Sequence, residues 1–125
     1  MTSKLILSIG AILGALSVAI GAFGAHALKA TLEANQRLET FETAVKYQFY
    51  HTFAIIVVGL LLAKFDDKLL QYSSISFLAG IIIFSGSLYA LSISGVTKWG
   101  AVTPFGGLFL IIGWALMLLA IRRNF

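Results

Sequence analysis

Long apolar stretches dominate the chain and alternate with short polar connections. They cover residues 5–28, 47–65, 71–94 and 104–121, and the only charged residue within them is Lys64. About 20 apolar residues in a helix cross the ~30 Å hydrocarbon core of a bilayer. A charged side chain at the centre of such a helix costs about 2.5–3.5 kcal/mol. The pattern therefore predicts an all-α integral membrane protein with four transmembrane helices.

The connections predict how these helices follow one another. Residues 29–46 are mostly polar, but their apolar residues and the start of the next stretch keep helical spacing: Leu38, Phe41, Val45 and Phe49. We expect an amphipathic helix on the membrane surface that runs into the second span. The other links, 64–70 and 95–103, are short, and short links join antiparallel neighbours. Residues 1–125 thus form one domain, an up-down-up-down bundle.

Composition supports a membrane protein and excludes several functions. Hydrophobic residues make up 59% of the chain and charged residues 11%, with a mean hydropathy of +0.96, against about half and a quarter in soluble domains. The absence of cysteine excludes disulfides and thiolate zinc sites. The net charge of +4 is dispersed, unlike a nucleic-acid footprint. We expect membrane lipids as partners, no nucleic acid and no cofactor, and leave open a membrane-protein partner or a homo-oligomer.

Basic residues indicate the orientation. The side of the chain ends carries five of them: Lys4, Lys64, Lys68, Arg122 and Arg123. The opposite side carries four: Lys29, Arg37, Lys46 and Lys98. The positive-inside rule then favours a multi-pass protein of the cell inner (plasma) membrane with both termini in the cytoplasm.

A cleaved signal peptide is an alternative for the first stretch. Ala25, His26 and Ala27 imitate the small-residue cleavage pattern. The apolar run before them is longer than the 7–15 residues usual for a signal peptide, so we favour a retained helix.

Small residues predict where the helices touch. In the first stretch a seam repeats at steps of 4, 3, 4 and 3: Gly10, Gly14, Ser17, Gly21 and Gly24. A second stripe lies about 100° around the same helix: Ala11, Ala15, Ala22 and His26. Membrane helices pack closely at such residues. We expect the first helix to contact neighbours on two sides, and Gly14→Leu or Gly21→Leu to disrupt its packing.

Polar side chains at membrane depth gather toward the side away from the chain ends. The candidates for a binding pocket are His26, Tyr47, Gln48, His51, Ser85, Ser87, Tyr89 and Thr103. Buried imidazole and phenol groups in lipid require hydrogen-bond partners, so we predict that these side chains face one another across the bundle. Trp99 fits an interfacial aromatic belt, and Trp114 is interpreted as a packing residue.

Three hypotheses for this cluster stay open. It is a satisfied hydrogen-bond network that sets the helix register, or a binding site for a ligand, lipid headgroup or ion, or a catalytic site. A metal site is unsupported, because His26 and His51 are two ligands and a catalytic zinc takes three. Serine hydrolysis lacks an acidic partner at depth and a GxSxG elbow. We therefore assign no catalytic and no metal-binding residue.

Four ordered motifs carry a resemblance to a known family: GAFGAHALK, FETAVKYQFYH, FSGSLYAL and TPFGGLFLIIGW. In this order and spacing they resemble domain-of-unknown-function family 423, small four-helix membrane proteins of bacteria related to human transmembrane protein 256. The matching positions are Gly21, Gly24, His26, Tyr47, Gln48, His51, Ser85, Gly86, Ser87, Tyr89, Thr103, Pro104, Gly106, Gly107 and Trp114. The resemblance implies an integral membrane protein and no established reaction.

The leading hypothesis is a non-enzymatic membrane protein that acts by binding or assembly with another membrane component through a polar pocket in its outer leaflet. The alternative is a small oligomeric carrier or channel for protons, cations or a small molecule, with His26 or His51 titrating near neutral pH. A third, weaker alternative is a lipid-modifying enzyme that uses His51 as general base.

Overall fold

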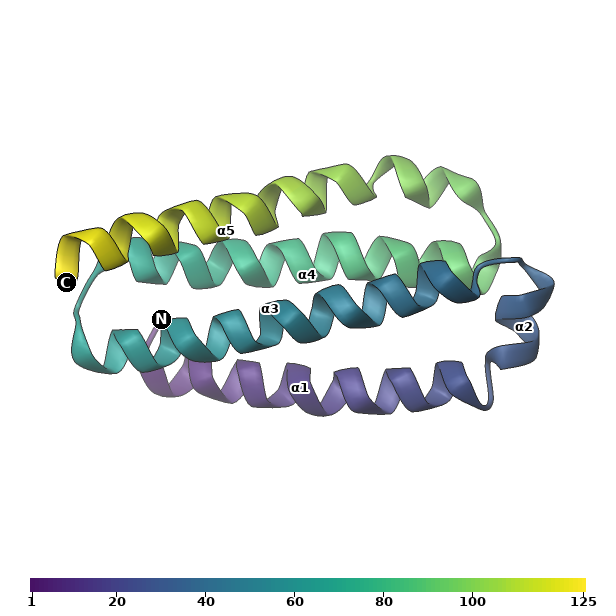
Figure 1. Ribbon diagram of the computed structural model, residues 1–125, viewed down its shortest axis with the longest axis horizontal. Helices are drawn as coiled ribbons and strands as arrows, with labels where there is room; N and C mark the ends of the chain where they lie inside the picture. The colour runs from purple at the N-terminus through teal and green to yellow at the C-terminus, as the bar shows by residue number, and fades with distance from the viewer.

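Four long helices run antiparallel along the length of the protein in the computed structural model, which describes residues 1–125 (Figure 1). The elements in chain order are α1 (Ser3–Ala25), α2 (Lys29–Ala34), α3 (Leu38–Lys64), α4 (Lys68–Ser94), the 3₁₀ helix η1 (Thr97–Ala101) and α5 (Thr103–Asn124). Four helices are long and apolar enough to cross a membrane. The predicted all-α fold with four spans is confirmed, and both chain ends lie at the end of the bundle opposite α2.

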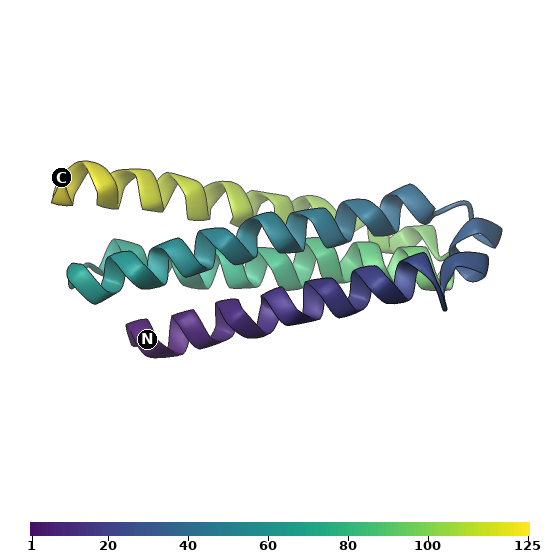
Figure 2. The ribbon, with the colours of Figure 1, turned by 60° about the horizontal axis from the view of Figure 1, so that its bottom comes forward.

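The four long helices form an open row more than a closed ring. α3 and α4 pack together at the centre, α1 packs against α3, and α5 packs against α4. Figure 2 shows α1 and α5 at opposite edges. In the apolar 18-residue segment of α4, half of the residues are buried. The corresponding share is 17% in α1 and 28% in the span that η1 and α5 form together. The two outer helices therefore present most of their surface to the surrounding membrane.

The predicted continuous helix over residues 29–46 is wrong, because the structure divides it. α2 ends at Ala34, and α3 begins only at Leu38. Between them Gln36 has a left-handed backbone with φ of 55°. The Asn35 side chain donates to the carbonyls of Ser92 and Ile93 at the end of α4, both at 3.0 Å. This tie to α4 turns the chain out of the helix and brings the surface segment down onto the bundle.

Local signals explain where the helices start and stop. Thr2 and Asp67 accept a backbone N–H at the starts of α1 and α4, as N-cap residues do. Gly95 ends α4 with φ of 74°, a left-handed conformation that glycine adopts without strain. Pro104 sits in the first turn of α5, where its missing N–H costs nothing. The predicted turn over residues 95–103 contains η1.

Within the predicted seam of α1, the tightest contacts lie at Gly10 and Gly24 and not at Gly14 and Gly21, the two positions expected to be most sensitive to substitution. A Cβ on Gly10 would come within 2.6 Å of Ile56 Cγ1, and one on Gly24 would overlap the ring of Phe41. At Gly14 and Gly21 the nearest side-chain atom would be 3.5 Å away, an ordinary van der Waals distance. The seam does face α3, but the helices approach most closely near its two ends.

The second small stripe of α1 makes no such contact. Ala11, Ala15, Ala22 and His26 are all exposed. The expectation that α1 touches a second neighbour along this stripe is therefore wrong for the single chain. Among the glycines, the one closest to a neighbouring helix backbone is Gly106 of α5, where a Cβ would run into the backbone of Phe84 in α4.

Candidate functional site

Gln48 joins three helices at the centre of the polar region. Its side chain is 3% exposed. The amide nitrogen donates to the carbonyl of Leu13 in α1 at 3.2 Å, and the amide oxygen accepts from the hydroxyl of Tyr89 in α4 at 2.6 Å. A carbonyl can only accept, so the amide has one orientation that satisfies both partners. The predicted meeting of Gln48 and Tyr89 across the bundle is present.

His51 has both ring nitrogens occupied within the protein. Nδ1 lies 2.7 Å from the carbonyl oxygen of Tyr47, one turn earlier in α3. The indole N–H of Trp114 in α5 donates to Nε2 at 3.1 Å. Because the carbonyl only accepts and the indole only donates, Nδ1 must carry the proton and Nε2 must hold the lone pair. The geometry thus fits one neutral tautomer of His51.

Serine and threonine hydroxyls complete the contacts of α4. Ser85 donates to the carbonyl of Ala44 in α3 at 2.7 Å. Ser87 and Thr103 share a hydrogen bond of 2.6 Å that links α4 to α5. No buried side-chain nitrogen or oxygen in the chain lacks a hydrogen-bond partner. The hydroxyl groups of Ser85, Ser87 and Thr103 thus form hydrogen bonds between helices, as the hypothesis of a satisfied polar network predicts.

The candidate residues therefore form separate networks in place of one open polar pocket. Gln48 and Tyr89, Ser87 and Thr103, and Ser85 with a backbone partner are brought together as described above. The ring of Tyr47 stacks on that of His51, with centroids 6.0 Å apart. His26 stays apart from all of these: it is exposed at the end of α1, beside Ala19, Ala22, Phe23 and Ala27.

Polar contacts are not confined to the half of the bundle near α2. In the half that holds the chain ends, Ser73 and Ser76 of α4 donate to the carbonyls of Gly113 and Phe109 in α5, at 2.8 and 2.7 Å. The sequence reading placed almost nothing comparable there and was wrong on this point. Serine is easy to miss, because its hydroxyl more often bonds the preceding turn of its own helix.

Trp114 is the residue of this region that the sequence reading missed. The sequence predicts a packing role for Trp114, but the side chain is 48% exposed and donates a hydrogen bond to His51. Its ring also meets Phe77 edge-on, with centroids 5.1 Å apart. A signal existed: a buried imidazole requires a donor or acceptor for each nitrogen, and α5 offers a single indole in its middle turns.

A groove runs between α3 and α5 beside this contact. It has a volume of about 460 Å³ and is lined by Tyr47, Tyr50, His51, Phe84, Gly107, Leu110, Ile111 and Trp114. We call it the α3–α5 groove. Tyr47 packs on Phe84 with ring centroids 4.7 Å apart, and Tyr50 is 58% exposed. Aromatic and aliphatic side chains form most of its wall, so the groove suits an apolar occupant.

A second polar cluster lies at the end of the bundle that holds the chain ends. Asp67, with a side chain only 2% exposed, accepts from the backbone N–H of Leu69 at 2.9 Å and from the amide of Asn124 at 2.6 Å. Arg123 Nε lies 3.5 Å from the same carboxylate. The hydrogen bonds from Leu69 and Asn124, aided by the charge of Arg123, hold the pKa of Asp67 below its ordinary value. This cluster fastens the end of α5 to the α3–α4 turn.

No three or more His, Asp or Glu side chains lie close enough together to hold a metal ion. His51 has no carboxylate partner among its hydrogen bonds, which go to a backbone carbonyl and an indole. The arrangement therefore lacks the base and orienting acid that nucleophilic catalysis combines.

Comparison with known proteins places this fold in a family. A family model described as "Protein of unknown function (DUF423)" matches residues 20–107. No solved structure matches the chain. The matched residues include the end of α1, all of α2, α3, α4 and η1, and the start of α5. Gln48, His51 and Tyr89 lie within the match, whereas Leu13 and Trp114 lie outside it.

Curated relatives are similar over nearly the whole chain. "UPF0382 inner membrane protein YgdD" of Escherichia coli (strain K12) is 40% identical over 123 residues, 98% of this chain and 93% of the relative. "UPF0382 membrane protein YwdK" of Bacillus subtilis (strain 168) is 38% identical over 122 residues, 94% of this chain and 95% of the relative. A "UPF0382 membrane protein" of Haemophilus influenzae is 44% identical over 86% of both chains. With its four membrane-spanning helices, the chain belongs to the DUF423 family of integral membrane proteins.

Proposed function

We propose that this protein is a non-enzymatic membrane component that assembles with another membrane protein. In this assembly, a transmembrane helix of the partner docks in the α3–α5 groove. The observation that carries the proposal is the pairing of Trp114 with His51. This hydrogen bond holds a half-exposed indole at the edge of an apolar groove. It also occupies the lone pair of the His51 imidazole, which is then not available to a substrate. The same contact therefore supports a binding surface and disfavours a reactive one.

The state of His51 argues against general-base catalysis. A general base must present a free lone pair to the proton that it removes. Here the Nε2 lone pair accepts a hydrogen bond from the indole of Trp114, and the Nδ1–H group donates a hydrogen bond to the backbone carbonyl of Tyr47. A substrate would have to displace the indole before the imidazole could act.

The shape of the groove favours a helix as its occupant. Gly107 lies in its wall, and small residues let helices approach closely in lipid. A Cβ on Gly107 would lie 3.7 Å from the ring of Phe84, an ordinary van der Waals distance, so no side chain covers Gly107 tightly. Tyr47 and Tyr50 are both exposed there, and their hydroxyl groups can bond a polar group on the partner.

A pair of glycine variants tests the proposal. Gly107→Leu places a large side chain in the groove, whereas a Cβ on Gly86 would meet nothing within 4 Å, and Gly86 lies outside the groove. Complexes are purified in mild detergent and weighed by native mass spectrometry. We expect the wild type and Gly86→Leu to retain a second membrane protein whose mass differs from that of this chain, and Gly107→Leu to lose it. A second copy of this chain as the only partner would contradict the proposal. Retention of lipid alone by all three, or proton or cation flux in liposomes, would overturn the proposal.

We also propose that both chain ends face the cytoplasm. The end of the bundle with the termini and the α3–α4 turn carries five of the nine Lys and Arg residues. Reporter domains fused to the C-terminus, one active only in the cytoplasm and one only outside it, test this. Activity of the outside reporter would reverse the orientation.

A further inference from the structure

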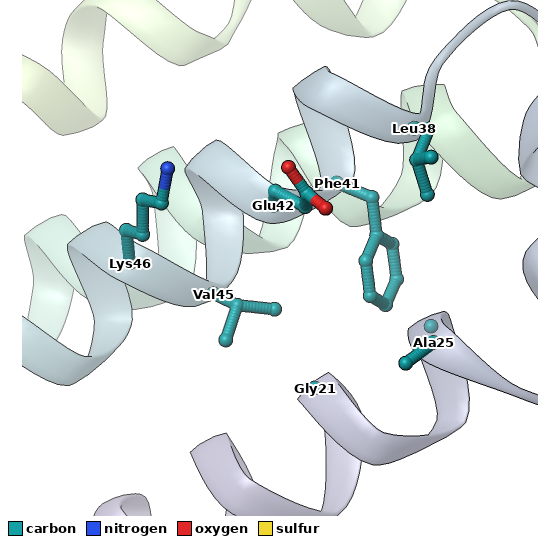
Figure 3. A pocket seen from close by; sticks show the side chains of 8 residues that line it. Gly21, Ala25, Leu38, Phe41, Glu42, Val45 and Lys46 are labelled. Atoms are coloured by element: carbon teal, nitrogen blue, oxygen red, sulfur yellow. The ribbon is translucent and has the colours of Figure 1, made fainter.

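A cavity of about 340 Å³ lies between the end of α1 and the start of α3, on the side of α3 away from the α3–α5 groove. It is lined by Gly21, Gly24, Ala25, Leu38, Phe41, Glu42, Val45 and Lys46. Figure 3 shows Phe41 and Val45 pointing from α3 toward α1, with the charged ends of Glu42 and Lys46 held apart on α3. We call this space the α1–α3 cavity.

The cavity has an apolar interior because α1 contributes no large side chain to it. Gly21, Gly24 and Ala25 form the α1 wall, and the ring of Phe41 and the methyl groups of Val45 form the α3 wall. Its volume falls within the roughly 300–1,000 Å³ of small-ligand pockets. Such a space accepts an alkyl chain and excludes strongly hydrated groups from its interior.

The charges at the cavity are opposite in sign and not paired. Glu42 and Lys46 are four residues apart, where a helix often forms an ion pair. Yet the two ion pairs of the chain join Lys29 with Glu33 and Arg123 with Asp67. Both Glu42 and Lys46 are exposed, so a carboxylate and an ammonium group remain free to bind a ligand that carries both charges.

The position of these charges matches the depth of lipid headgroups. Lys46 is the last charged residue before the uncharged run of α3 that begins at Tyr47. The cavity mouth therefore lies where the hydrocarbon core ends, and the cavity interior extends along α1 toward the core. A ligand held there has a zwitterionic end at the surface and an apolar chain below it.

We propose that the α1–α3 cavity binds a phospholipid whose headgroup combines a phosphate with a primary ammonium group, as in phosphatidylethanolamine. The Lys46 ammonium group bonds the phosphate, and the Glu42 carboxylate accepts from the lipid ammonium. A primary ammonium donates charge-assisted hydrogen bonds to a carboxylate, and a quaternary ammonium has no N–H to donate. Phosphatidylethanolamine is therefore favoured over phosphatidylcholine, whose quaternary ammonium donates no hydrogen bond to Glu42. It is also favoured over phosphatidylglycerol, which has no positive charge to place beside Glu42.

The test measures lipid retention by native mass spectrometry. The purified full chain is titrated in mild detergent with phosphatidylethanolamine, phosphatidylcholine or phosphatidylglycerol of identical acyl chains. We expect the wild type to retain phosphatidylethanolamine about tenfold better than either other lipid, as the loss of one charge-assisted hydrogen bond predicts. Glu42→Gln should lower phosphatidylethanolamine binding to the level of phosphatidylcholine. Lys46→Gln should weaken the binding of all three lipids.

Matched variants separate this site from general effects of charge. Lys29→Gln and Glu33→Gln make the same charge changes in the neighbouring pair on α2, which does not line the cavity, and should leave the lipid preference unchanged. Gly21→Leu fills the cavity without changing charge, and detergent melting checks that it folds. It should abolish the preference. Equal retention of the three lipids by the wild type, or equal effects of the α2 and cavity variants, would overturn the proposal. Gly107→Leu should keep the preference, so failure of the groove proposal is distinguishable.

Discussion

The indole nitrogen of Trp114 lies 3.1 Å from Nε2 of His51, although the two residues are 63 positions apart along the chain. This hydrogen bond joins α5 to α3, two helices that otherwise meet mainly through α4. It fixes the rotation of α5, because the indole reaches the imidazole from one face only. It also determines which ring nitrogen of His51 carries the proton.

Replacing Trp114 with Phe should weaken the bundle. The variant leaves Nε2 of His51 without a donor. Side-chain hydrogen bonds in membrane proteins contribute about 0.6 kcal/mol on average and up to about 1.7 kcal/mol, so we expect the free energy of unfolding to fall within that range. Unfolding in detergent measures it. Trp99→Phe is the control: Trp99 is exposed to a similar extent, 44% against 48%. Equal losses in both variants would show that the hydrogen bond adds nothing.

Gln48 and Tyr89 should be energetically coupled. Gln48→Leu leaves the Tyr89 hydroxyl unpaired inside the bundle, at a cost of about 1–3 kcal/mol. Adding Tyr89→Phe removes the orphaned hydroxyl, so the double variant should be more stable than Gln48→Leu alone. A double-mutant cycle measured by unfolding reports the coupling. Strictly additive losses would mean that the pair does not act as a unit.

The glycine contacts between α4 and α5 should tolerate the least change. Gly106→Ala would push a methyl group into the backbone of Phe84, and such overpacking costs about 1–3 kcal/mol. Gly86→Ala enters open space and should be close to neutral. Gly14→Ala, with its nearest contact at 3.5 Å, should resemble Gly86→Ala. Detergent melting temperatures rank the three, and a larger loss at Gly14 than at Gly106 would contradict the packing described here.

Acid should loosen the end of the bundle that holds Asp67. Its pKa in the folded protein lies below the ordinary value of 3.8. A carboxylate with a lowered pKa stabilises the fold fully above its unfolded-state pKa, and this contribution is lost as pH falls through the folded-state pKa. We therefore expect melting temperature to drop below about pH 4, and Asp67→Asn to reduce that drop.

The neighbouring Asp66 provides the control for this pH dependence. It is exposed and makes no ion pair, so Asp66→Asn should leave the acid profile unchanged. If both variants change the profile equally, the hydrogen bonds of Asp67 to Leu69 and Asn124 are not its source.

Helix number and order could be read from the sequence because they follow from local chemistry. An uncharged run of about 20 residues must bury its backbone polar groups in a helix to enter lipid. The break between α2 and α3 could not be read in this way. It depends on Asn35 reaching the carbonyls of Ser92 and Ile93, more than 50 residues away along the chain.

The candidate polar residues could be named from the sequence, but their partners could not. A buried amide or imidazole in a membrane helix must find hydrogen bonds, which identifies Gln48 and His51 as residues with partners. Which neighbour supplies the bond depends on how each helix is rotated and how far it is shifted along the bundle. Those quantities placed Trp114 on His51 and left His26 at the surface.

The sequence by itself thus determined a four-helix membrane protein, the antiparallel order of its helices, and which polar side chains at membrane depth require hydrogen-bond partners. Only the tertiary structure decided that the helices form an open row, that the polar groups satisfy one another, and that two apolar spaces flank α3. The reason is physical. Helical periodicity sets which residues share a face, whereas the contact that each face makes is set by close packing among all the helices together.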